Sequence, residues 1–462
     1  MKKNLIIALI IMFGTFLSAE RNLSLEESIQ LALQNNKELQ KAREEMGKYR
    51  QEYNIVRANL MPQISLSGGY NFKRTILPDS AIPELPSLST MLDSTATAND
   101  QVIAGYIDNG FASFIPEAES DEYTLAGSVK LEQAVFLGGK LINGIKIARK
   151  LYTLEEKKYY LSEQNLIFET QDKYYQTKLA GEVAKIQGEA LEFAELYYQQ
   201  VSDMQQQGMV SEYDKLRAEL EVKKMQPQVL EAEKNAKLAL QSFANHLNIE
   251  EVELNLTDGI SLPQMQEIDL ESALARALKN RMELELSEIG VEVGKVNLRY
   301  EKGNFLPNIG ITAEYNYFGT DQSKIEADDW GSSYSVGIGF SMPLFTGFSN
   351  NAKIKKARHS LQQSRLDHQA LQEMIRLDVR NSYLQWQADL EKVDTQVQNQ
   401  ELAEMGWQIA QARYENQISN QLEVIDAQLQ MKTAKLNYMN ARYAAAISYQ
   451  RLQKAMGKDL KK

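Results

Sequence analysis

Four short stretches of the chain alternate between apolar residues and small, polar or charged ones. In the first stretch Ile64, Leu66, Tyr70 and Phe72 lie on one face of the predicted strand, and polar side chains lie on the other. A period of two residues is typical of a β-strand whose two faces meet different surroundings. This pattern predicts strands over 63–75, 123–136, 308–319 and 332–345.

Between and after these strands the apolar residues are spaced three and four apart. One stretch starts near Lys140 and turns back at a break near Gly208, which predicts a helical hairpin over 140–247. At a rise of 1.5 Å per residue its outgoing helix would be on the order of 100 Å long. A second hairpin is expected over 350–456, and its return helix has the spacing of a coiled-coil seam, interrupted by Lys432.

The helix that opens the mature chain has clear signals at both ends. Ser24 followed by Glu27 is the pattern of an N-terminal capping box. The helix is expected to stop before Pro62, because a residue that precedes proline is disfavoured in helical backbone. Pro307 gives the same stop later in the chain.

The chain contains this pattern twice. Chance similarity between helical sequences does not explain the alignment, because it also fits at non-helical positions. Pairs that fix it are Pro62 with Pro307, Tyr70 with Tyr315, Phe136 with Phe345, Tyr174 with Tyr383, and Ala218 with Ala427. We therefore predict two structural repeats, 20–262 and 263–462, each with the order helix, strand, strand, helix, helix.

The first nineteen residues resemble a targeting segment rather than part of the fold. Two lysines precede a short apolar stretch that ends at Leu17, and the small residues Ser18 and Ala19 follow. This is the pattern of a secretory signal peptide over 1–19. The stretch is short for a membrane-spanning helix, and no later stretch of roughly 18 apolar residues appears. The mature chain is therefore expected outside the cytoplasm.

Composition and charge count against several classes of function. The net charge of −11 argues against nucleic acid as a partner, since nucleic acid needs a basic surface. The chain has no cysteine, and its three histidines have no metal-ligand spacing, so we expect no metal, no cofactor and no catalytic histidine. A phosphate-binding loop is also missing from the sequence. The sequence therefore does not predict an enzyme.

The four predicted strands have an apolar face and aromatic residues toward their ends, as membrane strands do. A sheet that spans lipid must close on itself, because no backbone amide can be left unsatisfied there. Four strands are too few, since roughly eight are needed. Several copies of the chain would have to share one barrel, and this argument alone does not choose between two and three. The alternative interpretation of the alternation is the edge of a soluble sandwich.

At this point the sequence resembles the TolC-like outer-membrane factor family over essentially all of 20–460. The segments that carry the resemblance are Leu60-Met61-Pro62, Phe305-Leu306-Pro307, Met342-Pro343-Leu344-Phe345-Thr346-Gly347 and Glu423-Val424-Ile425-Asp426-Ala427. The resemblance implies a mainly α protein with membrane β-structure. Each chain would form one third of a homotrimer, in which a 12-stranded β-barrel sits in outer-membrane lipid above a long α-helical coiled-coil barrel in the periplasm.

The resemblance also implies a function. Such a chain is the exit duct of a tripartite efflux or type I secretion system. It passively conducts substrates that an inner-membrane pump and a periplasmic adaptor protein supply. The leading alternative is a trimeric coiled-coil surface adhesin or stalk with a β-barrel anchor, although a stalk needs neither the duplication nor two returning hairpins. A soluble periplasmic enzyme is a second alternative, for which the sequence offers no catalytic constellation.

The resemblance further points to residues at the periplasmic mouth. Glu423 and Asp426 match acidic residues that ring the mouth in the family, and Tyr414 matches an aromatic residue that helps keep it closed. In a trimer each acid would form a ring of like charges that favours cations. The alternative is that both acids lie on a solvated helix face. Asp214 is a further gating candidate, and an unremarkable surface role is equally open for it.

The two hairpin tips match the adaptor-contacting region of the family. They comprise Gly208, Met209, Val210 and Ser211 in the first repeat and Gln417, Ile418 and Ser419 in the second. Many relatives carry an arginine where this chain has Ser419, and a glycine is common at the position of Gln417. The closing contacts are therefore not predicted in detail. The long acidic stretch between the first two strands is expected to be a surface loop on the outer side.

Overall fold

The computed structural model describes residues 21–78, 87–112, 119–250, 254–262, 268–321, 330–416 and 418–461. The expected signal peptide lies outside these residues. The chain divides into two compact units, and each repeat contributes to both. The helical unit comprises the described residues of Met1–Tyr53, Lys146–Leu298 and Lys356–Lys462, and the sheet unit comprises those of Asn54–Ile145 and Arg299–Lys355.

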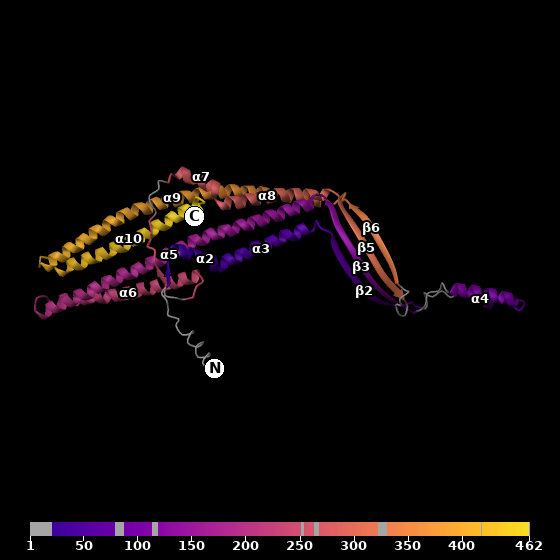
Figure 1. Ribbon diagram of the computed structural model, residues 1–462, viewed down its shortest axis with the longest axis horizontal. Helices are drawn as coiled ribbons and strands as arrows, with labels where there is room; N and C mark the ends of the chain where they lie inside the picture. The colour runs from indigo at the N-terminus through magenta and orange to yellow at the C-terminus, as the bar shows by residue number, and fades with distance from the viewer. Residues whose placement is uncertain are drawn as a thin grey trace, which may run out of the picture. The chain divides into compact units, whose positions relative to one another are not determined.

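Two long hairpins dominate the helical unit (Figure 1). The first joins α5 (Lys140–Gln206) to α6 (Glu212–His246), and the second joins α9 (Ser349–Glu415) to α10 (Gln421–Ala455). Both outgoing helices have 67 residues, which corresponds to roughly 100 Å of helix. Shorter helices precede each strand pair: α2 (Leu25–Asn35), α3 (Lys37–Ala58), α7 (Leu270–Asn280) and α8 (Met282–Lys302).

A small parallel sheet of β1 (Arg21–Leu23) and β4 (Leu254–Leu256) covers the first hairpin. Beneath it Tyr174 is fully buried, with its ring centroid 5.8 Å from that of Phe243. Its phenol donates to the Leu23 carbonyl at 3.2 Å and accepts from the Asp258 amide at 2.9 Å. These bonds fasten the start of the described chain to α5.

The predicted capping box at the start of α2 is confirmed. Ser24 Oγ accepts from the Glu27 amide at 3.2 Å, and Glu27 Oε2 accepts from the Ser24 amide at 2.8 Å. The hydrogen bonds from Ser24 lower the pKa of the Glu27 carboxyl. The helix expected to run on toward Pro62 is interrupted at Asn36, whose backbone is extended (φ −66°, ψ 124°). The equivalent Arg281 interrupts the second repeat in the same way (φ −70°, ψ 119°).

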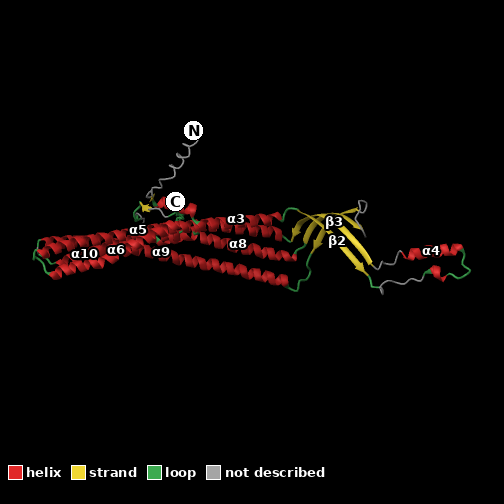
Figure 2. Cartoon of the chain, turned by 90° about the horizontal axis from the view of Figure 1, so that it is seen from below, coloured by secondary structure: helices red, strands yellow, loops and turns green. Residues whose placement is uncertain are grey.

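The sheet unit contains one antiparallel sheet with the strand order β2-β3-β5-β6 (Figure 2). β6 stops before the expected position 345, because Pro343 has no amide to donate to a ladder. In the part of the chain that the structure describes, β2 and β6 are the two edges of this sheet. The strands span β2 (Gln63–Ile76), β3 (Glu119–Leu137), β5 (Asn308–Asp321) and β6 (Trp330–Ser341).

The register of the strands places the apolar residues on one face. Leu66 lies opposite Val129, Val129 opposite Tyr315, and Tyr315 opposite Tyr334. All four side chains are exposed, Leu66 and Tyr334 by more than 80 %. On the other face hydroxyls meet instead. Phe318 is an exception, since it lies opposite Ala126 and Gly331 on the polar face. Apart from such positions, one face of the sheet is mainly apolar and the other mainly polar.

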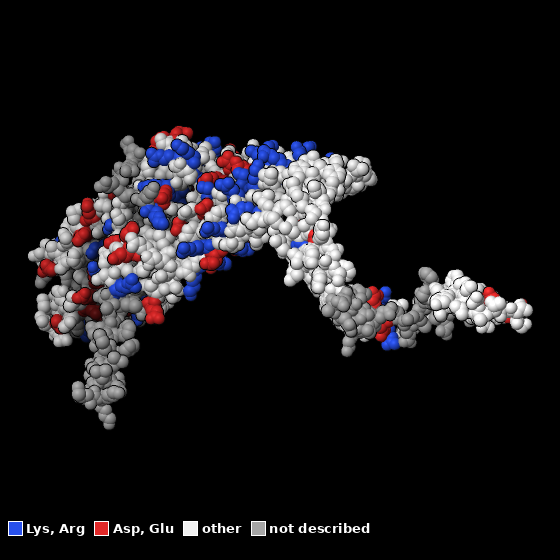
Figure 3. All heavy atoms as spheres, turned by 45° about the vertical axis from the view of Figure 1, so that its right-hand side comes forward, with Lys and Arg blue, Asp and Glu red and all other residues white. Residues whose placement is uncertain are grey.

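The polar face is held by its own contacts. Ser67 Oγ and Ser128 Oγ lie 2.8 Å apart, and Lys130 Nζ lies 2.6 Å from Glu132 Oε1. A sheet with one exposed apolar face and one hydrogen-bonding face has the character predicted for membrane strands. Figure 3 shows the contrast, since the sheet surface carries few charged side chains and many Lys and Arg gather on the helices next to it.

Two glycines meet where the helices pass into the sheet. Gly138 ends β3 with a positive φ of 62° and lies against Gly303, just before β5. A Cβ on either residue would collide with the carbonyl oxygen of the other. Gly347 occupies the equivalent turn of the second repeat, with φ 59°, and has open space around it. Glycine is thus required at the first turn for contact as well as for backbone conformation.

The segment between β2 and β3, predicted as a surface loop, has regular structure in its described part. Its described part contains a 3₁₀ turn (η3, Leu88–Met91) and a helix (α4, Ala98–Ala112). Asp108 on α4 accepts from the amides of Leu88 and Ser89 at 2.6 and 2.9 Å. The hydrogen bonds from Ser89 and Ser87 lower the pKa of the Asp108 carboxyl well below its usual range. Part of the acidic stretch, including Asp79, Glu84 and Glu117, lies outside the described residues.

Among the described residues, no helix contains an apolar stretch long enough to cross a lipid bilayer.

Candidate gating and docking site at the hairpin tips

The tip of the first hairpin is built by a glycine turn. α5 ends at Gln206, and Gly208 follows with φ 74°. The Met209 amide donates to the Met204 carbonyl at 2.9 Å, and the Gly208 amide donates to the Gln205 carbonyl at 2.9 Å. These are the two bonds of a Schellman motif, for which glycine is favoured because it adopts positive φ without strain. Met209 is exposed at the end of the turn.

The next helix starts directly after this turn with a closed capping box. Ser211 Oγ accepts from the Asp214 amide at 3.2 Å. Asp214 Oδ2 accepts from the Ser211 amide at 3.1 Å and from the Ser211 hydroxyl at 2.6 Å. Asp214 was a gating candidate, and the structure gives its carboxylate a local partner that stabilises the first turn of α6.

The second tip has a similar backbone and different side-chain bonds. The Ile418 amide donates to the Arg413 carbonyl at 2.8 Å, which closes the end of α9. Asn420 caps α10, with its Oδ1 accepting from the Glu423 amide at 3.2 Å. Ile418 is exposed, as Met209 is at the first tip. The Ser419 hydroxyl is buried without a hydrogen-bond partner among the described residues. Gln417 lies outside the described residues.

The Asp214 carboxylate accepts hydrogen bonds from its N-cap residue Ser211, whereas the Glu423 carboxylate pairs with a residue of another helix. Its Oε1 lies 3.3 Å from Nε of Arg413, at the end of the opposite helix of the same hairpin. Asp426 lies one turn further along α10 and is exposed. The two acids that matched the family's mouth region therefore differ, because one carries a basic partner and the other faces solvent.

The two hairpins of the chain meet just behind their tips. Val424 of α10 is buried with Val201 of α5 and Ala218 of α6. Gln421 Nε2 donates to the Asp214 carbonyl at 3.3 Å, which links the first turns of α10 and α6. Asp214 is thus joined to the second hairpin through its backbone rather than through its carboxylate.

A column of aromatic rings continues this contact. The ring of Tyr414 lies 5.8 Å from that of Tyr197, and Phe193 stacks on Tyr197 with centroids 6.1 Å apart. Trp407 meets Phe193 edge-on at 5.8 Å. Burial, with the nearby Tyr414 phenol as a second cause, raises the pKa of the Tyr197 hydroxyl far above its usual range. Tyr414 therefore belongs to the packed join between hairpins.

The structure places Tyr414 and Asp214 in the contact between the two hairpins, and Asp426 is exposed one turn beyond Glu423. Sequence reasoning missed Arg413, Tyr197, Phe193 and Trp407. A signal for the aromatic residues was present, since Phe193 and Tyr197 are four apart and Trp407 and Tyr414 seven apart, so that each pair shares a helix face. For Arg413 the signal was its place at the end of a hairpin helix, opposite the first turn of the next.

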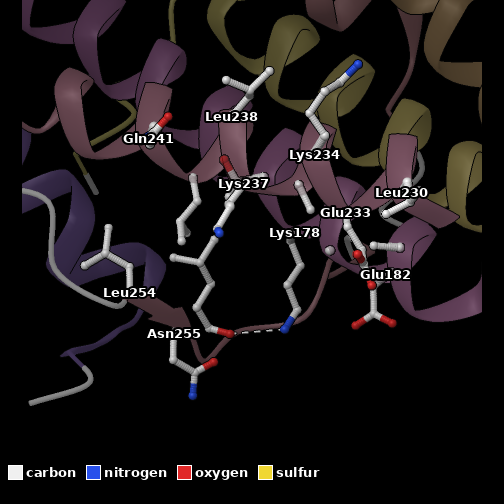
Figure 4. A pocket seen from close by; sticks show the side chains of 16 residues that line it. Lys178, Glu182, Leu230, Glu233, Lys234, Lys237, Leu238, Gln241, Leu254 and Asn255 are labelled. Carbon is white, nitrogen blue, oxygen red and sulfur yellow. Dashed lines mark hydrogen bonds between the residues drawn. The ribbon is translucent and has the colours of Figure 1, made fainter. Parts of the chain in front are cut away.

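A groove of about 880 Å³ lies elsewhere in the helical unit, between α5, α6 and β4. Figure 4 shows the side chains that line it, with Lys178 reaching the Leu256 carbonyl at 3.1 Å. Its lining mixes leucines with Glu182, Glu233 and Lys237, and it has no histidine. Among the described residues no cluster of three or more acidic or histidine side chains could hold a metal. The groove offers no arrangement for catalysis.

The fold, two long helical hairpins joined to a four-stranded sheet with one apolar face, defines the class of outer-membrane channel proteins with a helical barrel. The sequence matches the family described as "Outer membrane efflux protein" over residues 28–248 and 273–458. The chain belongs to this family. It is therefore an outer-membrane protein with helices in the periplasm, and it is not an enzyme.

Known proteins similar to the chain agree with this assignment. It is 22 % identical to "Outer membrane protein TolC" of Salmonella enteritidis, over 97 % of this chain and 85 % of that protein. The fold is similar to the Campylobacter jejuni CmeC outer membrane channel, with a TM-score of 0.75 at 17 % identity over 94 % of this chain and 85 % of that one. It is equally similar to a membrane protein from Pseudomonas aeruginosa, with a TM-score of 0.75 at 15 % identity over 95 % and 91 %.

Proposed function

We propose that this chain is the exit duct of a tripartite efflux or type I secretion system. Three copies would form one channel that passively conducts substrates from an inner-membrane pump and a periplasmic adaptor to the exterior. The match to the outer membrane efflux protein family over most of the chain carries this proposal. The sheet supports it, because β2 and β6 are open edges of a sheet with an apolar face. Such a sheet needs further strands to close in lipid.

We further propose that Asp426 and Glu423 ring the periplasmic mouth, with Tyr414 packed behind them. The Arg413 side chain beside Glu423 offsets much of the charge of that residue. Asp426 is exposed and has no basic partner among the described residues, so it would contribute most of the negative potential. Three aspartates around a narrow opening would attract cations, above all multivalent ones. Asp214 would act through the backbone link to Gln421 rather than as a charge.

Conductance in planar bilayers tests this proposal. Purified protein should form discrete cation-selective pores, whereas an adhesin or stalk would give no current. Asp426→Asn should weaken block by a trivalent cation on the order of tenfold, and Glu423→Gln should weaken it less. Asp394 is an exposed acid of α9 that lies several turns before the tip. Asp394→Asn removes the same charge and should leave block unchanged. Equal effects of all three variants would reject the assignment of the mouth.

The exposed tip residues Met209 and Ile418 are the proposed adaptor contacts. Deleting Gly208 to Ser211 would also remove the turn and the cap, so point substitutions give a cleaner test. Met209→Ser with Ile418→Ser should abolish cross-linking to the adaptor in cells while trimers still form. Leu402→Ser, at an exposed leucine of α9 several turns before the tip, is the control. Unchanged cross-linking in the double variant would contradict the contact.

A further inference from the structure

The helices that connect to the four-stranded sheet do so at one end of it. α3 leads into β2 and α8 leads into β5, whereas α5 follows β3 and α9 follows β6. Gln63 near the start of β2 lies opposite Glu132 of β3. Asn308 at the start of β5 lies opposite both Leu137 of β3 and Ser341 of β6. The two strand starts and the two strand ends therefore meet at the same end of the sheet.

The helix ends at this position are basic, although the chain as a whole is acidic. The chain has 62 acidic and 51 basic residues. The four helix ends within the sheet unit have six basic residues against one acidic residue, Glu301, and they cover 54–58, 140–145, 299–302 and 349–355. Basic side chains are prominent on the helices next to the sheet in Figure 3. We call these six residues the basic belt: Arg57, Lys140, Arg299, Lys302, Lys353 and Lys355.

The fold leaves three cations of the basic belt without an acidic partner. Lys302, Lys353 and Lys355 are exposed and form no ion pair with a described residue. At the opposite end of the sheet the situation differs, since Lys73 Nζ lies 4.0 Å from Glu122 Oε2. The two lysines near the start of α9 also do not stabilise their own helix, because the first turns of a helix favour acidic residues. The charge of the belt is therefore available to a partner outside the chain.

Exposed apolar residues directly precede the basic belt at α9. Leu344 and Phe345, between β6 and α9, are 91 % and 77 % exposed. Lys353 and Lys355 follow four and six residues after Ser349, the first residue of α9, which is about 6–9 Å along the helix. The headgroup layer of a bilayer is roughly 5–8 Å thick on each side. Helix side chains lean toward the helix N-terminus, so these lysines lean back toward the apolar residues.

We propose that the basic belt binds anionic phospholipid headgroups in the leaflet of the outer membrane that faces the periplasm. The helices of this outer-membrane protein lie in the periplasm, so the helix end of the sheet lies at that leaflet. A lysine ammonium donates hydrogen bonds to phosphate oxygens. Each basic residue at an anionic membrane surface strengthens binding about fivefold. The inference goes beyond the proposed duct, because it requires only that the sheet lies in the membrane.

Analysis of bound lipid tests this proposal. The full chain is reconstituted into bilayers of phosphatidylethanolamine with a minor share of phosphatidylglycerol, both with the same acyl chains, and is then extracted in mild detergent. Mass spectrometry gives the ratio of the two lipids that stay bound. The wild-type protein should retain phosphatidylglycerol about threefold or more above its share of the bilayer. The belt variant, Lys302→Gln with Lys353→Gln and Lys355→Gln, should retain it close to that share.

Two control variants isolate the position and the charge of these lysines. Replacing all three by arginine keeps the charge and should keep the wild-type enrichment. The second control removes the same charge at exposed lysines further along α5, α6 and α9, and it should also keep the enrichment: Lys185→Gln, Lys223→Gln and Lys392→Gln. Equal enrichment in the wild type and the belt variant would overturn the proposal. An equal loss in the belt variant and the second control would overturn it as well.

Conductance of the same samples separates the basic belt from the proposed duct. The belt variant should form pores of wild-type conductance while its bound phosphatidylglycerol falls. Altered conductance with unchanged bound lipid would place the three lysines in the lumen and overturn the lipid site, while the duct would stand. Enrichment that depends on the belt in a protein that forms no pores would support the lipid site and contradict the duct.

Discussion

The two hairpin tips occupy equivalent positions in the duplication and use their first acidic residue differently. Asp214 and Glu423 are both the third residue of a helix that starts after a turn. In the first tip the acid closes a capping box with Ser211. In the second tip Asn420 caps the helix alone, and Glu423 pairs with Arg413 across the hairpin.

The difference shows that the backbone of a tip does not determine what its charges do. Both tips turn through the same kind of backbone hydrogen bond, from Met209 to Met204 and from Ile418 to Arg413. Once an asparagine caps α10, the acid at the third position is no longer needed for the cap. It becomes available to a residue on the opposite helix. The first tip is locally self-contained, and the second depends on a contact across its hairpin.

Removing the ring of Tyr197 should cause the largest loss of stability at the two tips. Tyr197 joins the first hairpin to Tyr414 of the second, and its equivalent in the second repeat is Gly406. Tyr197→Ala should cost about 3–5 kcal/mol of local stability, because it empties a buried site. Hydrogen exchange at both tips should accelerate together. Tyr213→Ala, at an exposed tyrosine of α6, is the control and should change exchange little. Faster exchange at one tip only would contradict the join.

Loss of the helix caps should have an intermediate effect and should separate the two tips. Ser211→Ala removes a hydroxyl that both donates and accepts, and we expect it to destabilise the start of α6 by about 1–2 kcal/mol. Asn420→Ala removes a single bond and should cost about 0.5–1 kcal/mol at the start of α10. Amide exchange over the first turns of both helices measures this order. A reversed order would show that the closed box adds nothing to the first tip.

Breaking the pair between Arg413 and Glu423 should have the smallest effect on stability. Both side chains are about half exposed, so Arg413→Gln should cost less than about 1 kcal/mol. It should nevertheless raise cation selectivity, because Glu423 then contributes its full charge at the mouth. The reversal potential under a salt gradient measures this, and Arg413→Lys should retain the wild-type value. Unchanged selectivity in Arg413→Gln would place Glu423 away from the conducting path.

Much of the fold follows from periodic patterns in the sequence. Alternation over 64–72 was enough to place β2 and to assign its apolar face, because a period of two has one structural meaning. Ser24 and Glu27 predicted a capping box from spacing alone, since all the atoms involved lie within one helical turn. The hairpins over 140–247 and 350–456 follow from spacing that persists for dozens of residues.

Sequence reasoning missed one local signal, at Asn36, and contacts between distant segments. The break at Asn36 lacks proline or glycine, and the Asn36 side chain stabilises it by accepting from the Leu39 amide at 3.0 Å. Tyr197 and Tyr414 are far apart in sequence, so no local pattern predicts that their rings meet. The early end of β6 was predictable, because Pro343 was visible in the sequence and its missing amide has a known effect.

The contact between Gly138 and Gly303 makes a position in one predicted repeat depend on a position in the other. The backbone carbonyl of each glycine excludes a side chain at the other. A smaller neighbouring side chain would therefore not make room at either position. A Cβ at Gly347 would contact no described atom of its own chain, so no intrachain contact requires glycine there. A turn of the first predicted repeat is thus constrained by a residue of the second. A mutational scan should find the first turn intolerant even of alanine, at both residues alike.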